Sequence, residues 1–249
     1  MTAGQEDVAA LRFGFAVAVI TAVLTVVTFG TALTAVPNSG RNCRADCVGY
    51  PFAGDVLARE FPGDYLWMFP AMALMVAFVA FMAAIHGHVP EPRRVFSLLG
   101  LCLAVLAAAV LLVDYFIQVT VLQPSLTKGQ LDGWSLVTQY NPNGIFIALE
   151  ELGYLLMSLA LATMASSLTG GTRAERAIRR IVSAGLLAAV VALAAVSWVH
   201  GFDRQDTFEV IVISIVWLTL APTAVLSAVV FRRAAGGTAL RPGPTGPGR

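Results

Sequence analysis

Charged side chains are scarce in this sequence. They make up 12% of its 249 residues, whereas soluble domains carry about 25%. Hydrophobic residues account for 57%. This composition excludes an ordinary soluble domain and is typical of integral membrane proteins. The formal net charge is only +1, and a nucleic-acid partner would require a clustered basic face. We therefore expect membrane lipids to surround the chain, and we expect no nucleic acid to bind it.

Histidine and cysteine are also rare, with three residues of each type. His86 and His88 are two positions apart, so a helix would point their rings in different directions. No two histidines are expected at a matching depth, which argues against a haem site. Fingerprints such as GxGxxG, GxSxG and HExxH are absent from any usable context. The sequence therefore predicts no cofactor and no metal, and it identifies no catalytic residue.

Long apolar runs dominate the rest of the chain. A transmembrane helix needs about 20 apolar residues, and Pro, Gly, Asn or charged residues separate the runs that reach this length. The predicted spans cover residues 13–36, 65–85, 95–122, 144–168, 181–200 and 208–231. The third run exceeds the bilayer thickness, so it should tilt or emerge. The fold class is therefore all-α, a polytopic integral membrane bundle of six transmembrane helices.

Basic residues predict the orientation of this bundle, because cytoplasmic loops carry an excess of Lys and Arg. With both ends inside, the inner side holds 11 basic residues and the outer side holds 5. The inner set is Arg12, Arg93, Arg94, Arg173, Arg176, Arg179, Arg180, Arg232, Arg233, Arg241 and Arg249, and the outer set is Arg41, Arg44, Arg59, Lys128 and Arg204. We therefore expect a multi-pass protein of the plasma membrane with both termini in the cytoplasm. Residues 1–234 would form the membrane domain, and residues 235–249, rich in Gly and Pro, would form a disordered cytoplasmic tail.

Cys43 and Cys47 lie in the first predicted outer loop. An outer location permits a disulfide, and a turn would bring the two Cα atoms within the required distance of about 4.4–6.8 Å. Two unpaired thiols are the plain alternative. A metal site would need more ligands, and the loop contains no histidine. We predict a Cys43–Cys47 disulfide.

Three acidic residues, Asp114, Glu150 and Glu151, fall well inside predicted spans. An ionised carboxylate in hydrocarbon costs about 2.5–3.5 kcal/mol on insertion scales, so such residues usually face the bundle interior or a water-filled cavity. Counting about 1.5 Å per residue from the outer helix ends places Asp114 and Glu150 about 10–12 Å deep. Their two helices are consecutive and antiparallel, and are therefore expected neighbours. These acids would form an acidic layer in the outer half of the membrane.

Helical spacing extends the acidic layer to three further polar side chains that share helix faces with the acids. The complete set of predicted ligand- or proton-binding residues is Asp114, Gln118, Asn143, Glu150, Glu151 and Tyr154. Glu150 and Glu151 point about 100° apart on a helix, and the sequence does not decide which of them faces the interior. No Lys or Arg is predicted within a span at this depth. We therefore expect at least one of the three acids to be protonated at neutral pH.

Three classes of function stay open at this point. The first is a protein that binds or transports protons, cations or another small ligand through the acidic layer. The second is a membrane-embedded enzyme whose paired carboxylates act as acid and base on a lipid or isoprenoid. The third is a structural or accessory subunit in which the acids only form hydrogen bonds between helices. We favour the first, because no histidine or metal site is expected beside the acids. The Glu150–Glu151 pair also departs from the CAAX-type intramembrane proteases, since Leu155 occupies the place of their required arginine.

Overall fold

The computed structural model describes residues 3–35, 39–43, 47–130 and 132–239. All regular structure in these residues is helical, and six helices are long and apolar enough to cross a membrane. The long helices are α1 (Ala3–Ala32), α3 (Met68–His88), α4 (Arg94–Ile117), α6 (Ile145–Ser167), α7 (Arg173–His200) and α8 (Asp206–Ala239). The short elements are α2 (Gly54–Leu57), η1 (Ala58–Glu60), η2 (Gly63–Tyr65), η3 (Glu91–Arg93), η4 (Gln118–Leu122), α5 (Gln123–Thr127) and η5 (Trp134–Leu136). The predicted all-α bundle with six spanning helices is confirmed.

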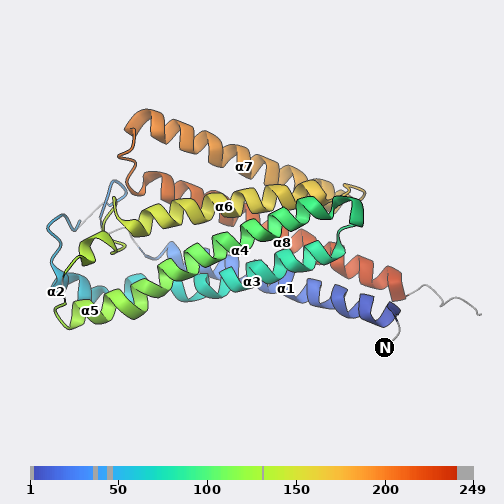
Figure 1. The fold of residues 1–249 in the computed structure, drawn as a ribbon, viewed down its shortest axis with the longest axis horizontal. Coiled ribbons are helices and arrows are strands. Elements are labelled where there is room, and N and C mark those ends of the chain that lie inside the picture. Colours follow the sequence, from blue (N-terminus) through green and yellow to red (C-terminus); the bar gives the residue numbers. More distant parts are fainter. Residues whose placement is uncertain (1–2, 36–38, 44–46, 131, 240–249) are drawn as a thin grey trace, which may run out of the picture.

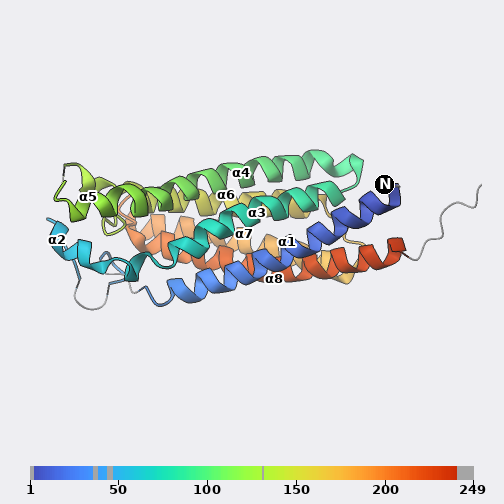
Figure 2. The ribbon, with the colours of Figure 1, turned by 90° about the horizontal axis from the view of Figure 1, so that it is seen from below.

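Five of the long helices form a ring, and the sixth lies outside it. The ring runs α1, α3, α4, α6, α8 and back to α1, and each of these helices packs against its two neighbours. Helix α7 packs only along the outside of α6 and α8, at the edge of the molecule (Figure 1). Seen from below, all six helices follow the long axis of the molecule (Figure 2). Because only 17% of the most apolar stretch of α7 is buried, most of that helix is available to lipid.

Small residues bring α4 and α6 into close contact. Association of helices in lipid depends on van der Waals packing, which favours small side chains at the interface. A Cβ atom at Gly100 would lie 3.0 Å from the backbone oxygen of Ala160, and one at Gly153 would lie 2.5 Å from Cγ of Leu111. The buried face of α4 comprises Ser97, Gly100, Ala104, Ala107, Ala108, Leu111, Asp114 and Tyr115. The close packing therefore carries the last two of these side chains into the bundle interior.

The two ends of the bundle differ in their loops. We call one the disulfide end, because it carries the bonded Cys43 and Cys47, whose Cα atoms are 5.8 Å apart. The predicted disulfide is confirmed. The connections that follow α1, α5 and α7 lie at this end, and the N-terminus and the close of α8 lie at the other (Figure 1). The start of α1 and the end of α8 therefore lie on one side of the bundle, as an even number of crossings requires.

Several helix boundaries differ from the predicted spans, because caps and loops, not apolarity, set where a helix ends. Helix α1 ends at Ala32, four residues before the predicted end. Helix α7 starts at Arg173, where Thr172 and Glu175 form a capping box. Helix α8 continues to Ala239 and so takes in the first five residues of the predicted disordered tail. Residues 240–249, with Arg241 and Arg249, lie outside the described residues, as do Val36 and Arg44.

The long third run passes beyond α4 through a π-helical turn, η4, into α5. The helical path of this run therefore continues past the end of α4. π-helical turns are rare in proteins and are frequent near functional sites. This one begins at Gln118, directly after the segment of α4 that carries Asp114 and Tyr115.

Candidate functional site

A cavity of about 800 Å³ opens at the disulfide end of the bundle. Loop residues form its rim, and residues of α1, α6 and α8 form its deeper part. The rim includes Ser39, Arg41, Asn42, Gln139, Tyr140 and Pro142, and the deeper part includes Phe29, Phe146, Glu150, Glu209, Ile213 and Trp217. Trp217 lies eleven residues along α8 from Asp206, which is about 16 Å at the helical rise. We call this space the acidic cavity.

Glu150 lies in the deeper part of the acidic cavity and is fully buried. Its Oε1 atom accepts a hydrogen bond of 2.8 Å from the hydroxyl of Tyr115, which lies 2.9 Å from the hydroxyl of Tyr154. Its Oε2 atom receives no hydrogen bond from any donor in the described part of the chain. The Tyr115 phenol therefore fixes one oxygen of the carboxyl group and is itself held by Tyr154, and the other oxygen is left without a partner.

Glu209, on the first turn of α8, completes the acidic site. Its carboxyl group lies beside that of Glu150, close enough for the charges of the two groups to interact. Asp114, on α4, lies close enough to interact with the charge of both groups, is 3% exposed and does not line the cavity. We call Asp114, Glu150 and Glu209 the acid triad. It joins three helices that are far apart in the sequence.

The sequence interpretation missed Glu209 and Tyr115. Glu209 is the second residue of the predicted span 208–231, so the sequence places it at the outer surface and not in the acidic layer. The signal that could have found it is the spacing Glu209, Ile213, Trp217, since residues four apart share a helix face and all three line the cavity. Tyr115 follows Asp114 directly, and nothing in the sequence separates it from an aromatic residue that faces lipid.

The expectation that all three acids lie away from fixed positive charge is wrong for Glu151. Its Oε2 atom lies 2.5 Å from Nη2 of Arg204, and Nε of the same guanidinium lies 3.4 Å from Oε1. The bond to Glu151 raises the pKa of Arg204, so the guanidinium stays charged. The physical reason is the short connection from α7 to α8, which brings a long basic side chain back against α6. Glu150 is therefore the member of the pair that faces the cavity.

Two predicted site residues lie apart from the acid triad. Gln118 donates from Nε2 to the backbone oxygen of Val137 at 2.7 Å, and its Oε1 accepts from the backbone N–H of Gln139 at 3.1 Å. It therefore fixes the loop that forms the cavity rim. Asn143 is exposed, and its backbone N–H donates to Oδ1 of Asn141 at 3.0 Å. Neither residue lines the cavity, whereas Tyr154 joins the hydrogen-bond chain at Glu150.

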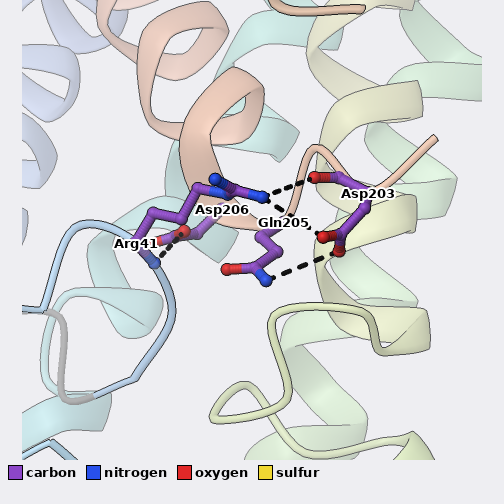
Figure 3. A network of polar contacts seen from close by, with 4 residues as sticks. All are labelled: Arg41, Asp203, Gln205 and Asp206. Atoms are coloured by element: carbon purple, nitrogen blue, oxygen red, sulfur yellow. Dashed lines mark hydrogen bonds and ion pairs between the residues drawn. The ribbon is translucent and has the colours of Figure 1, made fainter. Parts of the chain in front are cut away.

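The Asp206 carboxylate fixes one side of the rim. It accepts from the backbone N–H groups of Arg41 at 2.9 Å and Asn42 at 3.2 Å. The guanidinium of Arg41 turns away to Asp203, with an Nη2–Oδ2 distance of 3.2 Å (Figure 3). Gln205 also donates to Asp203, at 3.4 Å. The loop that follows α1 is thereby attached to the first turn of α8, beside the acidic cavity.

Tyr140 fixes another side of the rim. Its hydroxyl donates to Oδ2 of Asp64 at 2.9 Å. Burial, followed by the nearby Tyr65 and Asp64, raises the pKa of Tyr140 well above its ordinary value, so the hydroxyl stays protonated and remains a donor. Asp64 and Asp206 are thus engaged in holding the rim. The carboxyl groups left to meet a ligand in the cavity are those of Glu150 and Glu209.

Aromatic rings form a continuous wall of the acidic cavity. The rings of Phe29 and Trp217 have centroids 5.5 Å apart, and those of Trp67 and Trp217 have centroids 6.5 Å apart. The ring planes are inclined to one another by 58° in the first pair and by 67° in the second. All three residues line the cavity. We call Phe29, Trp67 and Trp217 the aromatic wall.

Comparison with known proteins adds no function to this geometry. No family model, no curated protein and no solved structure matches the chain. The six apolar helices fit an integral membrane protein. A more specific function has to be inferred from the acidic cavity.

Proposed function

We propose that this is a cell-membrane protein that binds protons or a small cation in the acidic cavity, which faces the outer aqueous phase. The observation that carries the proposal is the pair formed by Glu150 and Glu209. Their carboxyl groups meet in the buried part of a cavity, and Oε2 of Glu150 has no donor among the described residues. The orientation follows from the arginine-rich loops at the opposite end.

Two adjacent carboxylates repel one another strongly where water is scarce, so a proton or another cation must lie between or beside them. The titratable groups packed around the pair are Asp114 and Tyr115 on α4, Tyr154 on α6 and Asp206 on α8. None of these is basic. The nearby guanidinium of Arg204 is bound to Glu151. A cation from outside the chain is therefore the partner that the pair lacks.

The unpaired oxygens argue against a purely structural role. A hydrogen-bond cluster that only joined helices would leave few buried acceptors unmatched, because each unmatched acceptor costs about 1–3 kcal/mol. Oε2 of Glu150 and Oδ2 of Asp114 both lack a donor among the described residues, and a cavity leads to the first.

Infrared difference spectroscopy of the protein in liposomes, between acidic and alkaline buffer, tests the proposal. We expect a protonated-carboxyl band that is lost in both Glu150→Gln and Glu209→Gln. Glu91→Gln, which changes an exposed glutamate at the other end, should leave the band intact. A band that survives both cavity substitutions would refute the proposal.

Proton flux into the same liposomes separates binding from transport. The cavity-lining residues of α1, α6 and α8 all lie in the half of each helix nearer the disulfide end. We therefore expect wild-type flux equal to that of empty liposomes. Flux above this baseline that is lost in Glu150→Gln would instead assign transport to the same site.

A further inference from the structure

We infer that the ligand of the acidic cavity is an organic ammonium ion, held against the aromatic wall and neutralised by Glu150 and Glu209. This inference rests on the proposed cation site and adds the chemical class of the ligand. Three independent observations carry it: the ring arrangement, the lack of a metal-binding geometry and the size of the cavity.

The aromatic wall supplies what an ammonium ion needs beyond charge. The negative face of an aromatic ring attracts a cation within about 6 Å of its centroid, and tryptophan is the strongest partner. Trp67 and Trp217 both line the acidic cavity, and Phe29 adjoins Trp217. These rings meet at an angle and are not stacked flat against one another. Groups of angled aromatic rings of this kind bind alkylated ammonium ions in other proteins.

The acids beside the wall fit an organic cation better than a metal ion. Calcium takes six to eight oxygen ligands and magnesium about six in near-octahedral geometry. The described residues contain no group of three or more His, Cys, Asp or Glu side chains placed to hold a metal. Two carboxyl groups beside an apolar wall instead match a cation with one charge and an apolar surface. Arg41 on the rim does not oppose such a cation, because Asp203 engages its guanidinium.

The volume of the cavity agrees with a molecule and exceeds what a proton needs. Sites for small organic molecules usually enclose about 300–1,000 Å³, and the acidic cavity measures about 800 Å³. Its rim consists of loops at the disulfide end, so a water-soluble ion reaches the aromatic wall without crossing the bundle.

Calorimetric titration of the purified full-length protein with choline, and with its neutral isostere 3,3-dimethylbutan-1-ol, tests this inference. The two probes have the same shape and differ in charge. We expect choline to bind about 30-fold or more tightly than the isostere, which corresponds to the strength of a desolvated cation–π contact. Choline affinity should fall by a similar factor in Trp217→Leu and in Glu150→Gln, and Trp217→Phe should retain most of it.

Trp198→Leu is the matched control, because Trp198 lies on α7 and is 92% exposed. It should bind choline as the wild type does, and melting temperatures show which variants remain folded. Equal affinity for both probes, or unchanged choline binding in folded Trp217→Leu and Glu150→Gln, would overturn the inference. If choline fails to bind while the infrared band of Glu150 and Glu209 is present, only the ligand class is wrong. If the band is missing as well, the cation site itself fails.

Discussion

At the scale of single residues, adjacent glutamates have different partners because a helix turns about 100° between them. Glu150 meets phenols, Glu209 and the cavity. Glu151 meets the guanidinium of Arg204. Two neighbouring glutamates therefore differ in role: Glu150 belongs to the acid triad beside the cavity, and Glu151 attaches the α7–α8 connection to α6.

Removing the partner of Glu151 should destabilise the protein. Arg204→Gln leaves a carboxylate that is 12% exposed without its cation. Breaking a buried ion pair costs about 3–5 kcal/mol. We expect a loss near the lower end of that range, since the Arg204 side chain is itself 24% exposed. The melting temperature in detergent measures the effect. The double variant Glu151→Gln with Arg204→Gln should recover most of the loss, and a single variant as stable as wild type would contradict the prediction.

At the scale of elements, close helix packing and two loop attachments position the site. Small residues draw α4 against α6 and so place Tyr115 beside Glu150. Gln118 holds the loop before α6, and Asp206 holds the loop after α1. The rim of the acidic cavity is therefore fixed by side chains whose own elements start or end at that place.

Adding one methyl group to the α4–α6 interface should weaken the bundle. In Gly153→Ala the new Cβ atom would lie 2.5 Å from Leu111, and overpacking of this kind costs about 1–3 kcal/mol. Gly87→Ala, where nothing lies within 4 Å of the new atom, is the matched control. A lower melting temperature in the first variant alone is the expected result. Equal melting temperatures would show that α4 and α6 adjust freely.

Asp206→Asn should release the loop that follows α1. An amide has one acceptor oxygen, whereas two backbone N–H groups now share the carboxylate, and a buried donor left without a partner costs about 1–3 kcal/mol. We expect faster hydrogen exchange at the amides of Arg41 and Asn42. Asp203→Asn changes an exposed ion pair, which contributes about 0–1 kcal/mol, and should leave these amides nearly unchanged. Equal exchange in the two variants would argue against the role of Asp206.

At the scale of the whole molecule, the ring of five helices leaves α7 at the periphery and a cavity at one end. That end carries the disulfide, and the arginine-rich connections lie at the other. The chain is thus polarised along the membrane normal, which is the direction in which an aqueous ligand would approach.

Thiol labelling in intact cells should confirm the predicted orientation. In a Cys102→Ser background, Lys128→Cys places a thiol at the exposed disulfide end, and Glu91→Cys places one at the exposed opposite end. An impermeant maleimide should label the first variant directly and the second only after permeabilisation. The reverse pattern would mean that the acidic cavity faces the cytoplasm.

The sequence determined the bundle of six helices, because the length of an apolar run is a local property and the thickness of the bilayer sets the length that a spanning helix needs. It also determined the disulfide, since a separation of four residues leaves a turning loop little choice. It placed Asp114 and Glu150 in the interior, because ionised groups avoid lipid. For Gln118 and Asn143 the spacing indicated only that they share a helix face with an acid. It did not indicate what that face contacts, and neither residue lines the cavity.

Only the tertiary structure decided which groups meet. Glu209 joins Glu150, and Arg204 takes Glu151, across more than fifty residues of chain. Such pairings depend on how a ring of helices closes and where a loop folds back, and helical periodicity within one segment carries no information about either. The local sequence therefore determined where the spans lie and which acids are buried. The packing of the helices into a ring determined the partner of each acid.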